Sequence, residues 1–132
     1  MERDEASEDA VTRVFVVDDT PQVLRMLEQM LTLDEFEVVG LAASGETAVP
    51  GVDDTDPDVV VIDYKMPGLD GLATTRLIRE HRPDQAIILY SAYLDDAIER
   101  DAHQAGVALC VEKIDGISRL ERDIRRLAGE LF

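Results

Sequence analysis

The sequence contains one cysteine, no tryptophan and few aromatic residues, and each shortage excludes a class of protein. Cys110 has no partner in the chain for a disulfide, so a disulfide-stabilised scaffold and a cysteine-rich zinc site are excluded. Aromatic residues are 5% of the 132 residues, so the core has to be built from Val, Ile, Leu, Ala and Met. The apolar share of 45% is sufficient for one folded domain of this length.

Long apolar runs and positive charge are also scarce. No run approaches the ~18–20 residues of a membrane-spanning helix, and the start, MERDEASEDAVT, lacks the basic and apolar regions of a signal peptide. The chain has 13 Lys and Arg against 29 Asp and Glu, and the net charge of −16 repels nucleic-acid backbones. We therefore expect a cytoplasmic protein without membrane insertion or direct contact with nucleic acid.

After an acidic segment, 1–12, that is typical of a disordered tail, a short apolar run followed by an amphipathic stretch repeats five times. This pattern predicts strands at 13–17, 36–42, 58–62, 86–90 and 107–111, and helices at 21–33, 44–56, 70–81, 94–104 and 117–131. Thr20 and Pro21 are typical of a capped helix start, whereas Pro50 and Gly51 predict that the second helix is short. Glu37 in the second run, and the small residues of the fifth, predict that these two strands lie at the sheet edges.

Strands that alternate with helices predict an α/β fold, a doubly wound parallel sheet, over residues 13–131. Ligands of such sheets bind at the carboxyl ends of the strands. In this sequence the strands end in polar residues: Asp18 and Asp19, Asp63, Ser91 and Lys113. Three carboxylates and one ammonium leave a deficit of two positive charges, which Mg²⁺ would supply. A carboxylate beside such an ion is a competent nucleophile for a phosphoryl group.

Four segments make the pattern specific: VVDD at 16–19, VVVIDYKMPGLDG at 59–71, ILYSAY at 88–93 and VEK at 111–113. Together they resemble the receiver domain of bacterial two-component response regulators, over about residues 13–131. The resemblance implies a flavodoxin-like sheet of five strands in the order 2-1-3-4-5, with five helices. It also implies a signalling domain, not an enzyme, and because the chain ends after the fifth helix we expect a stand-alone receiver.

The resemblance assigns roles to individual residues. Asp63 is the phosphoacceptor, and its donor is a histidine kinase or a histidine phosphotransfer protein. Mg²⁺ is held by Asp18, Asp19, Asp63 and the backbone carbonyl of Lys65, while Ser91 and Lys113 bind the phosphoryl oxygens. We further expect the side chains of Lys65 and Tyr93 to flank the path of attacking water and to lengthen the life of the acyl phosphate.

The sequence departs from the family at two positions. Ile114 replaces the proline that usually follows the lysine, so this loop is expected to have a trans peptide bond and a different shape. Cys110 replaces an aromatic switch residue, so the usual coupling between that ring and Ser91 is not expected. We expect Cys110 to be a small, buried or half-buried strand residue without a catalytic role.

Two other functions stay open at this stage. A receiver-like scaffold that no longer accepts phosphate is favoured by the changes at Cys110 and Ile114. A phosphatase of the haloacid dehalogenase type would need an acid two residues after Asp63, where this chain has Lys65. The family also forms dimers through the fourth helix, fifth strand and fifth helix. Here that surface combines arginines with acids, which predicts a charged contact: Arg119, Arg122 and Arg126 with Asp95, Asp96, Glu99 and Asp101.

Overall fold

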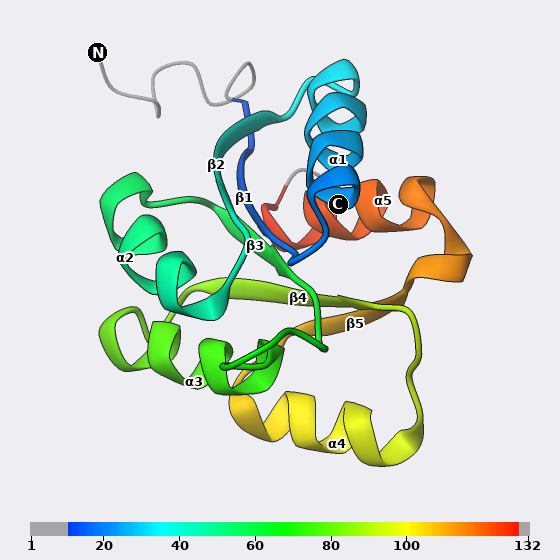
Figure 1. Ribbon diagram of the computed structural model, residues 1–132. Coiled ribbons are helices and arrows are strands. Elements are labelled where there is room, and N and C mark those ends of the chain that lie inside the picture. The colour runs from blue at the N-terminus through cyan, green and yellow to red at the C-terminus, as the bar shows by residue number, and fades with distance from the viewer. Residues whose placement is uncertain (1–10, 130–132) are drawn as a thin grey trace.

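The computed structural model describes residues 11–129, in which five parallel strands form one sheet. The strands are β1 (Arg13–Val17), β2 (Glu37–Ala42), β3 (Val59–Ile62), β4 (Ala86–Ser91) and β5 (Leu109–Glu112). Their order in the sheet is β2-β1-β3-β4-β5, which confirms the predicted α/β topology and the two predicted edge strands (Figure 1). The inner strands are buried on both faces because helices cover the sheet from two sides.

The helices are α1 (Pro21–Leu33), α2 (Gly45–Thr55), α3 (Gly71–His81), α4 (Asp96–Ala105) and α5 (Ile117–Leu127). They divide the core in two: α1 and α5 cover one face of the sheet, and α2, α3 and α4 cover the other (Figure 1). Strand β3 supplies both cores, since Val60 and Ile62 face one layer while Val59 and Val61 face the other. None of the described helices is long and apolar enough to cross a membrane.

Two helices differ from expectation, α2 in its length and α1 in the capping of its first turn. The second helix was expected to be short, but α2 continues for 11 residues through Pro50. Its start is capped by Ser44, and Ala48 and Val52 are fully buried, so packing outweighs the hydrogen bond that proline cannot make. Thr20 precedes α1 as expected, yet its side chain makes no capping bond. Its N–H instead donates to the carboxylate of Asp18, 2.9 Å away.

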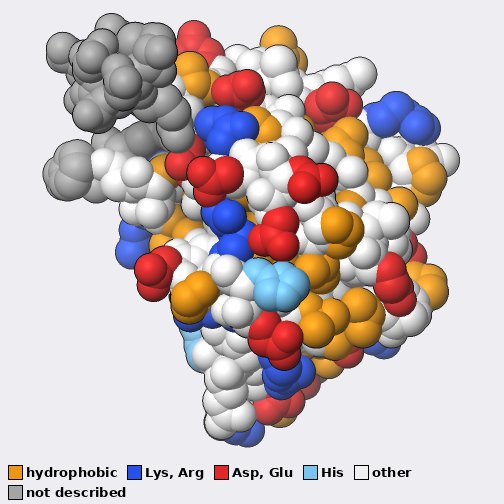
Figure 2. All heavy atoms as spheres, turned by 90° about the vertical axis from the view of Figure 1, so that its left-hand side faces the viewer, with side chains coloured by type: hydrophobic (Ala, Val, Ile, Leu, Met, Phe, Trp, Pro, Cys, Tyr) orange, Lys and Arg blue, Asp and Glu red, His pale blue; other side chains and the backbone are white. Residues whose placement is uncertain are grey.

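Near both ends of the described part of the chain, the structure differs from the predicted bounds. Residues 1–10 of the predicted tail lie outside the described residues, but Thr12, which we assigned to that tail, is buried. Its carbonyl accepts a hydrogen bond from the N–H of Glu37 at 2.9 Å, so pairing with β2 already begins there. Helix α5 ends at Leu127 instead of residue 131, and residues 130–132 lie outside the described range. On the face seen in Figure 2 acidic side chains are dispersed among basic and apolar ones, as on a solvated surface.

Candidate functional site

The ends of β1 and β3 hold three acidic residues side by side. The N–H of Asp18 donates to the carbonyl of Ala42 at 3.1 Å, and the N–H of Asp63 donates to that of Val17 at 2.9 Å. Pairing between strands therefore extends past the strands themselves and fixes the backbone of both acids. Asp18, Asp19 and Asp63 each offer one carboxylate oxygen to a cluster in which these atoms lie within 4.8 Å of one another.

Lys113 inserts its ammonium group among these carboxylates. Its Nζ lies 3.0 Å from Oδ2 of Asp18 and 3.5 Å from Oδ1 of Asp63. Asp18 is 1% exposed, and its other oxygen accepts the N–H of Thr20, so both oxygens are satisfied. Burial alone would lower the pKa of Lys113, but the hydrogen bond to Asp18 and the charges of both acids outweigh it and raise that pKa.

Asp63 experiences the opposite balance. Burial raises its pKa above the ordinary value, the charge of Asp18 raises it further, and the ammonium of Lys113 opposes both. The N–H of Tyr64 also stabilises the carboxylate by donating to Oδ1 at 2.9 Å. Burial is the largest of these effects, so the net rise reflects a carboxylate that is partly removed from water. Counted as formal charges, three carboxylates and one ammonium still leave the cluster net negative. A divalent cation with oxygen ligands fits this donor set.

Ser91 ends β4, in register with Glu112 and hence next to the strand that carries Lys113. The Ser91 side chain is almost buried, and its hydroxyl donates to the carbonyl of Tyr93 at 2.8 Å. The hydroxyl is therefore engaged by its own loop. Tyr93 is 62% exposed, and its phenol oxygen lies 3.4 Å from Oδ2 of Asp95, at the start of α4.

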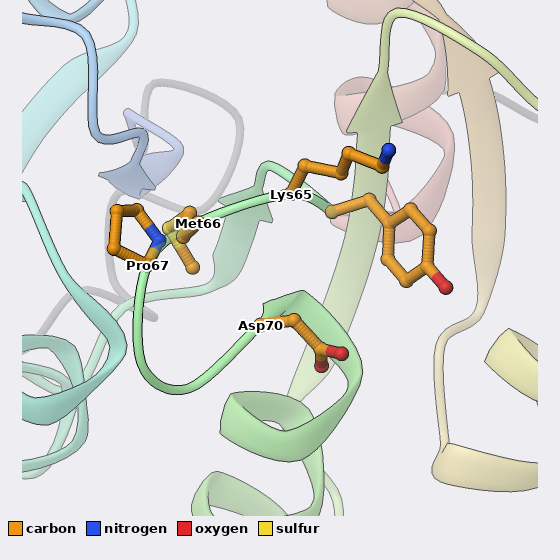
Figure 3. A pocket seen from close by; sticks show the side chains of 5 residues that line it. Lys65, Met66, Pro67 and Asp70 are labelled. Carbon is orange, nitrogen blue, oxygen red and sulfur yellow. The ribbon is translucent and has the colours of Figure 1, made fainter.

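The loop between β3 and α3 lines a pocket of about 360 Å³ with residues that include Tyr64, Lys65 and Asp70. Figure 3 shows the Lys65 side chain leaving this loop on the opposite side from Met66 and Pro67. Asp70 caps α3 by accepting the N–H of Ala73 at 2.8 Å. At the next residue, Gly71, an added Cβ would lie 2.2 Å from the carbonyl oxygen of Asp63, so only glycine permits this approach.

The two residues that depart from the family pattern lie in the edge strand β5, which contains Cys110, and in the turn after it, which contains Ile114. Cys110 is half-buried in β5 against the core under α2, α3 and α4. Burial, together with the charge of Glu99, raises the pKa of its thiol to about 11. Ile114 is 86% exposed in a short 3₁₀ turn, Lys113–Asp115, and the described residues contain no cis peptide bond.

The arginines predicted for a contact between molecules are mostly engaged within the chain. Arg119 Nε lies 3.1 Å from Asp123 Oδ2, and Arg126 Nη1 lies 3.6 Å from Asp123 Oδ1. Asp123 is 2% exposed, and no pattern in the sequence singles it out. Of the three predicted arginines, Arg122 is exposed and takes no part in these ion pairs with Asp123.

Sequence reasoning missed Tyr90, a buried residue whose ring centre lies 5.8 Å from Nζ of Lys113. A signal was present. Tyr90 pairs with Val111, which is two residues before Lys113 and therefore shares its face of the sheet. An aromatic residue immediately before Ser91 is thus a diagonal neighbour of the lysine.

Comparison with known proteins supports the same assignment. The model of the response regulator receiver domain matches residues 14–125. Response regulator GacA of Pseudomonas viridiflava is 36% identical over 122 residues, which are 91% of this chain and 57% of that protein. The chain thus spans little more than half the length of this relative.

Two solved structures extend the comparison. The receiver domain of the putative response regulator NarL from Mycobacterium tuberculosis has a TM-score of 0.84 at 30% identity, covering 92% of this chain and 98% of that one. Response regulator TrrA of Thermotoga maritima, in complex with Mg²⁺-BeF, has a TM-score of 0.79 at 30% identity, covering 89% and 99%. Since the family model spans most of the sequence and the strand order agrees, the chain belongs to the receiver domain family of two-component response regulators.

Proposed function

We propose that Asp63 accepts a phosphoryl group from the phosphohistidine of a histidine kinase or a histidine phosphotransfer protein. The observation that carries this proposal is the cluster of three carboxylates with Lys113 between two of them. An Asp63 oxygen attacks phosphorus in line with the histidine nitrogen. The O–P bond forms as the N–P bond breaks, and the imidazole leaves with the electron pair and takes a proton from water.

Asp18, Asp19 and Asp63, with the backbone carbonyl of Lys65, are the groups that would hold Mg²⁺. All four donors are oxygens, which this hard cation prefers, and the cluster has three carboxylates against one ammonium. When bound, the ion neutralises charge on the phosphoryl oxygens. The Mg²⁺-BeF complex of the relative TrrA supports this assignment.

Lys113 and Ser91 would bind the phosphoryl oxygens, and both have to change partners to do so. The ammonium leaves carboxylate oxygens, and the Ser91 hydroxyl leaves the carbonyl of Tyr93. In the family the ring of an aromatic switch residue swings inward as the hydroxyl moves, but Cys110 is too small for that role. The broken hydrogen bond would instead release the loop at Tyr93, which makes this exposed ring the first side chain to respond.

Lys65 and Tyr93 would tune the lifetime of the acyl phosphate by covering the path of water. Lys65 follows Asp63 by two residues and Tyr93 follows Ser91 by two, and neither offers a carboxylate or amide that orients water well. We expect the acyl phosphate of Lys65→Asn and of Tyr93→Ala to hydrolyse faster than that of the native protein. If neither substitution raises the autodephosphorylation rate, the two side chains do not shield the phosphoryl group.

We infer that the signal leaves this domain through protein contacts in the cytoplasm, without substrate turnover or nucleic-acid binding. A homodimer through α4, β5 and α5 is one such contact. Arg119 and Arg126 already pair with Asp123, so Arg122 would carry most of the attraction to acids of α4 in a second copy. Sedimentation of phosphorylated protein tests this: Arg122→Glu should weaken association, whereas Arg25→Glu, on the exposed side of α1, should not.

The experiment that tests the function is incubation with acetyl phosphate and Mg²⁺, followed by measurement of the intact mass. We expect one added phosphoryl group, absent in Asp63→Asn and retained in the control Asp70→Asn, whose amide still caps α3. No added mass in the native protein would favour the scaffold that no longer accepts phosphate. Continued turnover of a phosphate ester, abolished in Asp63→Asn, would favour the phosphatase.

A further inference from the structure

Tyr90 is a buried aromatic residue in β4 whose ring lies beside the ammonium group of Lys113. The side chain is 5% exposed and belongs to the core under α1 and α5, together with Val16 and Val111. Lys113 Nζ lies 5.8 Å from the centre of the ring. An ammonium group within about 6 Å of an aromatic face is attracted by the electron density of the ring.

The ring is the third group around this ammonium, after the carboxylates of Asp18 and Asp63. In the proposed reaction both carboxylates take other partners, because Asp18 would bind the cation and Asp63 becomes bonded to phosphorus. The ring is uncharged and neither binds the metal nor reacts. Its contact with Lys113 is therefore the one of the three that phosphoryl transfer leaves unchanged.

We propose that Tyr90 is a positioning residue, whose ring holds the ammonium of Lys113 beside Asp63 while the carboxylates change partners. This inference rests on the proposed function and adds to it a residue outside the acid cluster. A lysine side chain is a flexible four-carbon stem, so an ammonium released by two carboxylates would otherwise move into solvent. The charge of Lys113 opposes the rise that burial causes in the Tyr90 pKa, as expected for groups that interact.

The test is a double-mutant cycle on the rate of phosphorylation by acetyl phosphate, followed by intact mass. Tyr90→Phe keeps the ring and should stay within about twofold of the native rate, whereas Tyr90→Met should lower it about three- to tenfold. Lys113→Ala should make Tyr90→Met ineffective, because the ring then has no ammonium to hold. Ile88→Ala is the matched control, two residues earlier in the same strand and in the same core, and should lower stability without changing this pattern.

A second measurement does not depend on the reaction. The ring should shift the NMR signals of the Lys113 ε-methylene protons upfield in the native protein and in Tyr90→Phe, but not in Tyr90→Met. Equal rates for the Phe and Met variants, additive effects in the Lys113→Ala background, or unshifted ε-protons would each overturn the proposal. If the native protein gains no phosphoryl group while the ε-protons are shifted, the proposed function has failed, and with it the role of Tyr90, although the contact itself is real.

Discussion

Lys113 should contribute more to stability than any other exposed or half-exposed charge of the domain, because its ammonium compensates a carboxylate that cannot reach water. Asp18 is 1% exposed and its Oδ2 lies 3.0 Å from Nζ. Removing one partner of a buried ion pair costs roughly 3–5 kcal/mol. The Lys113 side chain is 27% exposed, so water replaces part of the lost interaction, and we expect about 3 kcal/mol for Lys113→Met. For a domain of this length that is a fall in Tm of roughly 10 °C.

The assay is thermal and urea unfolding with and without Mg²⁺. Mg²⁺ should recover at least half of the loss in Lys113→Met, because ion and ammonium compensate the same carboxylates. The control is Lys65→Met at the only other lysine, which is exposed and should change stability by no more than about 0.5 kcal/mol. A loss as large with Mg²⁺ as without it would refute the reasoning, as would an equal loss in the control.

The contribution of Lys113 to stability depends on pH in the way that its pKa shift predicts. The pKa of Lys113 is raised by folding, so its contribution is complete below the ordinary value of 10.5 and is lost as the pH rises through the folded value. At the acidic end, Asp63, whose pKa burial raises above the ordinary value, takes up a proton and no longer attracts the ammonium. The difference in stability between native protein and Lys113→Met should therefore shrink as the pH falls.

Three further substitutions probe the surroundings. Gly71→Ala should cost about 2 kcal/mol or more in urea unfolding despite the better helix propensity of alanine, because its Cβ would meet the carbonyl of Asp63; an unchanged midpoint would contradict this. Asp63→Asn should raise stability in metal-free solution at neutral pH, since folding raises the pKa of the native carboxyl, and the gain should vanish below pH 3.8. The Cys110 thiol, with a pKa of about 11, should be alkylated slowly at pH 8 and faster as the pH rises, and Cys110→Ala should still accept phosphate.

The parallel sheet and the convergence of Asp18, Asp63 and Lys113 could be predicted from alternation and sheet geometry, whereas the strand order was implied by the resemblance to receiver domains. Apolar runs locate the strands, and a parallel sheet brings all carboxyl ends to one edge. Helix α1 has the predicted bounds, and its start follows from Pro21 because proline suits the first helical turn. These features are local or topological, so the sequence carries them directly.

Features that depend on competition between contacts could not be predicted. Pro50 lies inside α2 because burial of neighbouring residues outweighs a missing hydrogen bond, and propensity alone does not contain that comparison. The Thr20 side chain makes no capping bond at the start of α1, and the N–H of Thr20 donates to the Asp18 carboxylate. The same holds for Ser91, which we expected to bind the phosphoryl oxygens and whose hydroxyl bonds within its own loop. In each case several partners are within reach, and packing decides among them.

The geometry of the acids bears on why a cation belongs at this edge of the sheet. Two surface carboxylates that repel each other can rotate apart into water, but Asp18 is buried and Asp63 is held by a backbone bond to Val17 and by the close approach of Gly71. Because the backbone of both acids is fixed and Asp18 is buried, positive charge is the direct way to relieve the repulsion between them. Lys113 relieves part of it, while burial raises the pKa of Asp63 and so adds to the cost of keeping its carboxylate charged. The net negative charge of these acids therefore favours a divalent cation at this edge of the sheet, and in the proposed reaction that cation would balance the charge of the phosphoryl group.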